Sequence, residues 1–146
     1  MPQPMLQRRS NPWLVIAAIL GGLAVALGAF GAHGLEARLA GPDRVLSAAA
    51  ERQMANWETA ARYQMYHALA LFAVGGLATI QPRTAVHCAG ACLTAGTLIF
   101  SGCLYALVLS EQRFLGAVVP LGGVLLLIGW VTLAYACFTL STKEPR

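Results

Sequence analysis

Four long apolar stretches without a charged residue alternate with short polar segments along this chain. The stretches cover residues 10–35, 63–82, 84–110 and 114–142, and all ten Lys and Arg and all six Asp and Glu lie between or beyond them. Each stretch reaches the roughly 20 residues that an α-helix needs to cross the hydrocarbon core of a bilayer. Because lipid offers no water to the backbone, such a stretch must close its own hydrogen bonds as a helix. The pattern therefore predicts an all-α integral membrane four-helix bundle.

Turn signals between the stretches set the limits of the four predicted spans. Gly34 begins the exit from the first span, and Gly41-Pro42-Asp43 form a turn beyond it. Pro120 is expected to break the first turns of the last span. We predict one transmembrane domain over residues 13–140, with spans at about 13–33, 62–80, 85–109 and 116–140, a disordered tail at 1–12 and a second tail at 141–146.

The polar segment between the first two spans predicts a further, partly interfacial helix. Asp43 or Ser47 can cap it, and Glu58 and Arg62 form a favourable pair four residues apart. We expect this helix to run into the second span at about Tyr63. Its apolar side recurs at helical spacing and comprises Met54, Trp57 and Ala61.

The composition excludes a second, soluble domain. Charged residues make up only 11% of the chain and hydrophobic residues 58%, whereas a soluble domain carries roughly 25% charged residues. Small residues recur every four positions at Ala18, Gly22 and Ala26, and again at Ala91 and Ala95. Because membrane helices pack through small residues, we interpret these stripes as seams inside the bundle, with a homodimer face as the alternative.

The net charge of +4 bears on orientation rather than on nucleic acid, because much of it lies in the tails. Lys and Arg are divided equally between the two predicted sides of the membrane. Arg8 and Arg9, just before the first span, favour cytoplasmic termini by the positive-inside rule. They also leave open a signal peptide ending near Ala29-Phe30-Gly31, although the apolar run exceeds the usual length of a signal core.

Counting depth along alternating spans brings several polar side chains into the half of the bundle opposite the termini. Only His67 and Ser101 lie clearly inside the predicted membrane; the others can reach its interface. Intramembrane ionisable groups suggest a functional site, but we favour the interpretation that this set forms an interfacial belt and hydrogen bonds between helices that fix their packing. The candidate cluster consists of His33, Arg62, Tyr63, His67, Ser101 and Tyr105.

Other chemistry is weakly supported. His33 and His67 could ligate a haem only at an awkward tilt, because they differ in depth. Cys88, Cys92 and Cys137 could suit zinc or a disulfide, but a cysteine in a span usually behaves as a small hydrophobic residue. The spans hold no carboxylate, and the chain has no metalloprotease, phosphate-loop or nucleophile–base motif. We therefore expect no cofactor, no metal and no enzymatic activity.

Two stretches resemble the signature of a family of small bacterial membrane proteins known as domain-of-unknown-function family 423. They are Gly28–Leu35 (GAFGAHGL) and Trp57–Leu71 (WETAARYQMYHALAL). In a third block, Phe100–Tyr105, Cys103 stands where the family pattern leads us to expect serine. The resemblance covers about residues 12–140 and implies a four-span inner-membrane protein, but no reaction, cofactor or partner. The later blocks are Phe100–Tyr105, Pro120–Gly123 and Gly129-Trp130.

The sequence thus favours a non-enzymatic accessory or assembly subunit of a complex in the bacterial inner membrane. Its expected partners are the lipid bilayer and other membrane subunits or a second copy of itself. The alternative is a protein that binds a lipid, a quinone or a proton path. That site would use His33, Tyr63, His67 and Tyr105.

Overall fold

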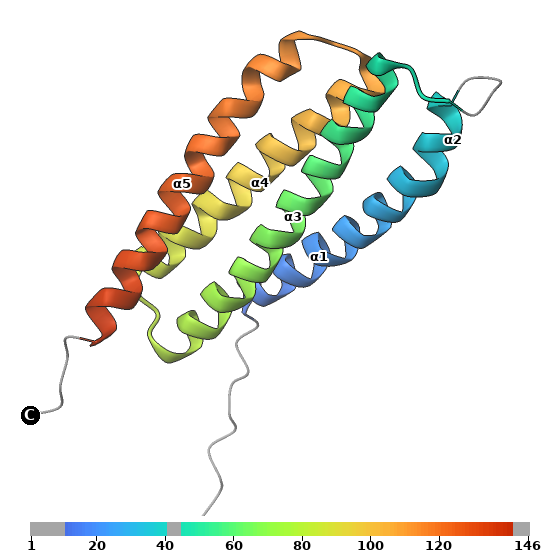
Figure 1. The fold of residues 1–146 in the computed structure, drawn as a ribbon. Helices are drawn as coiled ribbons and strands as arrows, with labels where there is room; N and C mark the ends of the chain where they lie inside the picture. Colours follow the sequence, from blue (N-terminus) through green and yellow to red (C-terminus); the bar gives the residue numbers. More distant parts are fainter. Residues whose placement is uncertain (1–10, 41–44, 142–146) are drawn as a thin grey trace, which may run out of the picture.

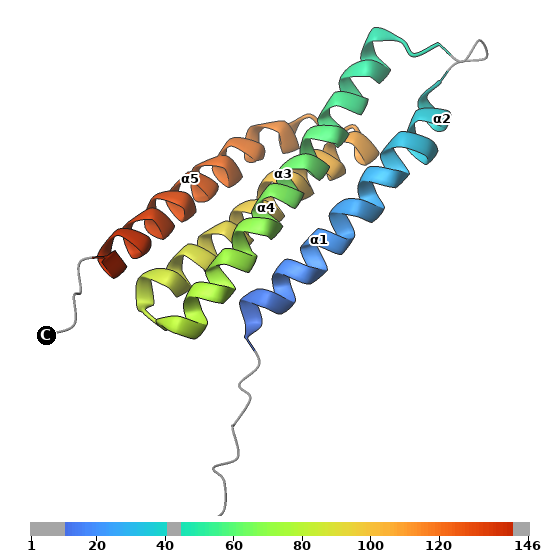
Figure 2. The same cartoon turned by 60° about the horizontal axis from the view of Figure 1, so that its bottom comes forward.

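The computed structural model describes residues 11–40 and 45–141, and these residues form helices joined by short turns. The long helices run side by side (Figures 1 and 2), so the predicted all-α bundle is confirmed. The Gly41-Pro42-Asp43 turn, the Asp43 cap and most of both predicted tails lie outside the described residues. The elements are α1 (Pro12–Phe30), a π-helical turn η1 (Gly31–Leu35), α2 (Glu36–Leu39), α3 (Ala48–Ile80), α4 (Thr84–Ser110) and α5 (Phe114–Ser141).

The helices pack in the order α1, α3, α4, α5, with α3 and α4 in the middle. The beginning of α1, the α3–α4 turn and the end of α5 meet at one end of the bundle (Figure 1). There the Asn11 side chain accepts from the backbone N–H of Trp13 (3.1 Å) and donates to the Gly75 carbonyl (2.7 Å). Arg83 donates to the Thr139 hydroxyl (3.2 Å). These bonds join the start of α1 to α3 and the α3–α4 turn to α5.

The first span continues further than Gly34, where its exit was predicted. After α1 the chain passes through η1 and α2 and remains helical to Leu39. The π-helical turn begins at Gly31, which lies against the indole of Trp57: a Cβ there would sit 2.5 Å from Cδ1. The extra residue in a π turn changes the face that a helix presents, and here it occurs where the bulky Trp57 crosses α1.

The segment predicted as an interfacial helix is the first part of α3. The Ser47 hydroxyl accepts from the Ala50 N–H (3.2 Å) and caps a single 33-residue helix that runs into the second span without a break. Helices long and apolar enough to cross a membrane are Pro12–Leu39, Thr84–Ser110 and Phe114–Thr139. α3 is not among them, since four charged residues occupy its first half and Gln64 and His67 its middle. That α3 crosses the bilayer stays a prediction.

Pro120 does not break the last span, so that expectation was wrong. It lies inside α5, which is helical without interruption from Phe114 to Ser141. Proline removes one backbone donor, yet transmembrane helices tolerate it when neighbouring groups take up the freed carbonyl.

The small-residue stripes were assigned to the wrong face. Ala18, Gly22 and Ala26 are exposed, as are Ala91 and Ala95. Both helices carry a second set of small residues, one or two positions away, and it is this set that faces the bundle. The inward set of α1 includes Ala17, Gly21, Ala24 and Gly28, and that of α4 includes Ala89, Gly90 and Gly96.

The outer surface of the bundle is strongly apolar. Large hydrophobic side chains stay exposed along α1, α3, α4 and α5, most densely on α5, where Leu127, Val131 and Phe138 are each about two-thirds exposed or more. Contiguous apolar surface of this extent is unusual on a soluble monomer. It fits a protein surrounded by acyl chains.

Candidate ligand-binding groove

His67 is the most buried ionisable side chain of the predicted cluster. It is only 5% exposed. Its Nδ1 lies 2.7 Å from the backbone carbonyl of Tyr63, one turn earlier in α3. A carbonyl can only accept, so Nδ1 carries the proton in this bond and Nε2 is left as an acceptor. His67 makes no other hydrogen bond to the described part of the chain.

A groove of about 450 Å³ opens beside His67, between α3 and α5, with Phe100 of α4 as its floor. The edge of the imidazole meets the Trp130 ring at a centroid distance of 6.3 Å, and Tyr63 packs on Phe100 at 5.0 Å. Tyr63 and Trp130 are 42% and 46% exposed, so the groove opens on the side of the bundle. Its lining residues are Tyr63, His67, Phe100, Pro120, Gly123, Val124, Leu126, Leu127 and Trp130.

A second group of residues joins α1, α3 and α4 and serves packing. The Trp57 indole donates to the Leu27 carbonyl (2.7 Å), and its ring packs on Tyr105 (centroids 4.6 Å). Gln64 donates to the Leu20 carbonyl (2.8 Å) while only 4% exposed. Hydrogen bonds between membrane helices typically contribute only about 0.6 kcal/mol each. The packing of the Trp57 and Tyr105 rings therefore contributes more to the stability of the bundle.

Ser101 and Tyr105 are buried hydroxyls without a hydrogen-bond partner among the described residues. Tyr105, with Gln64 and Thr97, borders a small cavity of about 170 Å³ between α1 and α4. An unpaired buried hydroxyl costs stability. Neither residue lines the His67 groove.

The structure therefore divides the predicted cluster. Tyr63 and His67 share the groove, and Ser101 and Tyr105 lie in the packed interior. Arg62 is exposed and pairs with Glu58 at 3.6 Å. His33 is exposed in η1, and its side chain makes no hydrogen bond or ring contact with the described residues.

Sequence reasoning missed the aromatic walls of the groove. Phe100 and Trp130 belong to stretches that resemble the family's blocks, but spacing along one helix cannot show that α4 and α5 bring them to His67. Trp57 was placed correctly on the apolar side of its helix. Its hydrogen bond to α1 could not be deduced, because the acceptor is a backbone carbonyl 30 residues away.

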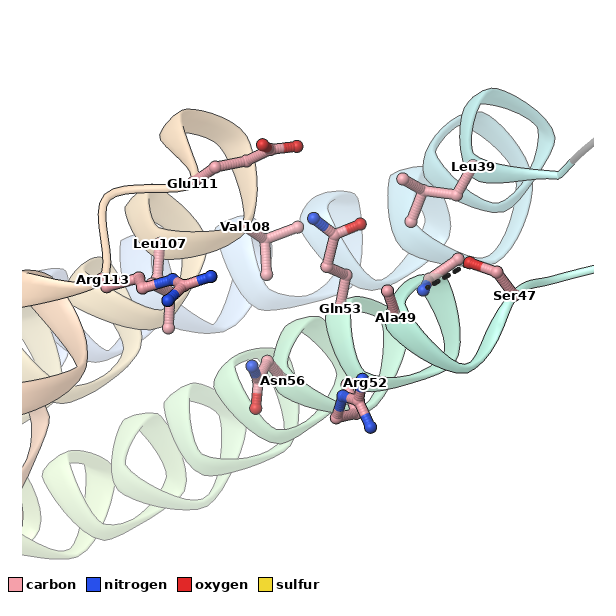
Figure 3. A pocket seen from close by; sticks show the side chains of 11 residues that line it. Leu39, Ser47, Ala49, Arg52, Gln53, Asn56, Leu107, Val108, Glu111 and Arg113 are labelled. Atoms are coloured by element: carbon pink, nitrogen blue, oxygen red, sulfur yellow. Dashed lines mark hydrogen bonds between the residues drawn. The ribbon is translucent and has the colours of Figure 1, made fainter.

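A larger and more polar pocket, of about 670 Å³, lies at the end of the bundle away from the α3–α4 turn (Figures 1 and 3). We call it the end pocket. It is bordered by α2, the start of α3 and the end of α4. Its lining residues are Leu39, Ser47, Ala49, Ala50, Arg52, Gln53, Asn56, Leu107, Val108, Glu111 and Arg113.

Residues 11–40 and 45–141 contain no group of three or more His, Cys, Asp or Glu that could hold a metal ion. The four cysteines are free. Beside Cys88, His87 accepts through Nδ1 from the Trp13 indole (3.0 Å), joining α4 to the start of α1.

An all-helical bundle with an apolar outer surface and three helices fit to cross a bilayer defines an integral membrane protein. The chain belongs to the family described as "Protein of unknown function (DUF423)", whose model matches residues 27–123. The resemblance found in the motifs is thus confirmed.

Two bacterial relatives illustrate the similarity. The UPF0382 membrane protein SERP0230 of Staphylococcus epidermidis is 42% identical over 124 residues, which cover 85% of this chain and 93% of the relative. The UPF0382 membrane protein YwdK of Bacillus subtilis is 42% identical over 125 residues, covering 85% and 94%. No solved structure matches the chain.

Proposed function

We propose that this protein is a non-enzymatic membrane protein that binds a small lipid-soluble molecule carrying a hydroxyl group. The observation that carries the proposal is the lateral groove with the acceptor of His67 in an otherwise apolar, aromatic wall. Ligand sites commonly combine apolar surroundings with a few fixed polar groups. The groove has that character and opens toward the membrane interior.

The tautomer of His67 selects the ligand class. While Nδ1 donates to the Tyr63 carbonyl, Nε2 can accept but not donate. A hydroxyl, such as that of an isoprenoid alcohol or a reduced quinone, complements it. A ligand that offers only a carbonyl does not.

The test uses two matched ligands, farnesol and its methyl ether, which differ in the hydroxyl proton. Binding to the purified protein is followed by fluorescence of Trp130, with Trp13 and Trp57 replaced by Phe. We expect farnesol to bind roughly fivefold more tightly, because one hydrogen bond contributes about 1 kcal/mol. His67→Phe keeps a ring against Trp130 but has no acceptor, so this variant should bind both ligands alike.

Equal affinity of the two ligands for the unsubstituted His67 protein would contradict the proposal. So would a preference for farnesol that persists in His67→Phe. Tyr105→Phe, which removes a hydroxyl outside the groove, is the control and should leave the preference unchanged.

The accessory or assembly role favoured by the sequence remains a second candidate, supported by the outward stripe of α1. Gly22 has open space where a Cβ would be, so a bulky residue there leaves the bundle intact but blocks close approach of another helix. After gentle extraction of tagged protein, Gly22→Leu should lose a co-purifying membrane subunit. Gly76→Leu, at an equally open glycine of α3, should retain it; loss in both or neither excludes the stripe as the docking face.

We also propose that the protein lies in the bacterial inner membrane with both termini in the cytoplasm. The placement of α1's start and α5's end at one end of the bundle supports a shared side for the termini. Their assignment to the cytoplasm rests on Arg8 and Arg9.

A further inference from the structure

The charged and amide side chains of the end pocket have no partner among the described residues, whereas Glu58 and Arg62, further along α3, form an ion pair. Glu58 and Arg62 meet at 3.6 Å on the surface of α3. Within the part of the chain that the structure describes, Arg52, Gln53, Asn56, Glu111 and Arg113 make no side-chain hydrogen bond or ion pair. Yet all five line one pocket.

Three different segments bring these groups together. Figure 3 shows Gln53 pointing from α3 into the space beside Val108 of α4, and Arg113 reaching toward the same space from the turn before α5. Gln53 and Asn56 are half-buried. Amides that are partly removed from water and still unpaired are suited to a ligand that supplies their partners.

Glu111 is held at the rim by an unusual backbone conformation. It ends α4 with φ 58°, in the left-handed region, and is the one non-glycine residue with positive φ among those described. Glycine is the residue that this position of a helix end favours. The acidic side chain is therefore present at a conformational cost, which points to a role of its carboxylate in ligand binding.

The pocket lies at the depth of lipid headgroups. Its wall includes Leu107 and Val108 from the end of α4, a helix apolar enough to cross the membrane. The end of such a helix emerges into the headgroup region. The lining has an apolar part, formed by Leu39, Leu107 and Val108, and carries two guanidinium groups and one carboxylate.

We propose that the end pocket binds the headgroup of a zwitterionic phospholipid, which presents a phosphodiester anion and a primary ammonium ion. Arg52 and Arg113 receive the phosphate through charge-assisted hydrogen bonds, which guanidinium groups form readily with phosphate oxygens. Glu111 receives the ammonium, and Gln53 and Asn56 hydrogen bond the remaining oxygens. The site is independent of the His67 groove, with which it shares no residue.

The proposal is tested by native mass spectrometry of the full chain in detergent, delipidated and then titrated with dioleoyl phosphatidylethanolamine or dioleoyl phosphatidylglycerol. The first lipid carries the ammonium and the second does not. We expect at least fivefold tighter binding of the ethanolamine lipid. Glu111→Gln should abolish this preference, and Arg113→Gln should weaken binding of both lipids about tenfold.

Matched controls are Glu51→Gln and Arg38→Gln, which change exposed charges outside the pocket and should not alter either affinity. A preference that survives Glu111→Gln, or binding that is unaffected by Arg113→Gln, overturns the assignment. Water-soluble glycerophosphoethanolamine carries the same phosphate and ammonium groups, so it distinguishes a membrane lipid from a soluble phosphate ester as the ligand. If it binds as tightly as the intact lipid, the ligand is a soluble phosphate ester and the lipid proposal fails.

Discussion

Trp57 joins three helices at the level where α1 changes to a π-helical turn. Its indole is 2% exposed, bonds the Leu27 carbonyl, and packs between Phe30 (centroids 5.4 Å) and Tyr105. Such a residue combines a specific donor with a large packed surface. The contributions of its ring and of its N–H to stability can be measured separately by substitution.

We predict that Trp57→Phe lowers the free energy of unfolding by about 1 kcal/mol, since it removes the hydrogen bond to α1 but keeps an aromatic ring. Trp57→Ala should cost about 3–5 kcal/mol, because it leaves a cavity between three helices. The measurement is reversible unfolding by sodium dodecyl sulfate, monitored by circular dichroism. Equal losses in the two variants would show that the ring contacts contribute little.

At the scale of elements, α4 and α5 form the closest helix pair, and glycine permits their approach. A Cβ on Gly122 would lie 2.5 Å from the backbone N of Phe100, whereas one on Gly102 would meet nothing within 4 Å. Backbone cannot move aside as a flexible side chain can, so the two glycines should respond very differently to the same methyl group.

Gly122→Ala should destabilise the bundle by about 1–3 kcal/mol through overpacking. Gly102→Ala should be neutral or slightly stabilising, because alanine is the better helix former. Unfolding midpoints of both variants in one detergent give the comparison. A destabilised Gly102→Ala would indicate that the outer face of α4 is packed against something in the native assembly.

For the whole molecule, the open question is whether α3 crosses the bilayer like its neighbours. Its second half packs between α1 and α4 along their length (Figure 2), and it carries buried Gln64 and His67 that lower its apolar character. Those polar groups face inward, so they need not oppose insertion.

We predict four crossings. Reporter domains fused after Leu46, after Arg83 and after Gln112 should show the first and last on one side and the middle one on the other. Alkaline phosphatase and green fluorescent protein fusions measure this side directly. Fusions after Leu46 and after Arg83 found on the same side would mean that α3 does not cross the bilayer.

The lipid-facing surface gives a further prediction, based on two tryptophans of contrasting exposure. Trp130 is 46% exposed and Trp57 2% exposed. In single-tryptophan variants reconstituted with brominated lipids, fluorescence of Trp130 should be strongly quenched and that of Trp57 should be largely protected. Similar quenching of both would contradict the packing of Trp57 in the interior.

The sequence by itself determined the helices, because uncharged stretches of this length have one stable form in lipid. It predicted helices within two residues of the observed bounds of α4 and α5 and gave Ser47 as one of two possible caps of α3. The family resemblance followed from short motifs, without any knowledge of how the helices pack.

Only the tertiary structure decided which faces meet. Ala17 and Ala18 begin two stripes of small residues one position apart, and helical periodicity fits either against α3; the side chains of the neighbouring helices selected the first. The side chains of neighbouring helices also explain why His67 lies beside an aromatic groove, whereas Tyr105 lies in the core. Helix formation depends on local hydrogen bonds that the sequence encodes position by position. The choice of contacting faces depends on complementary shapes contributed by segments far apart in the chain.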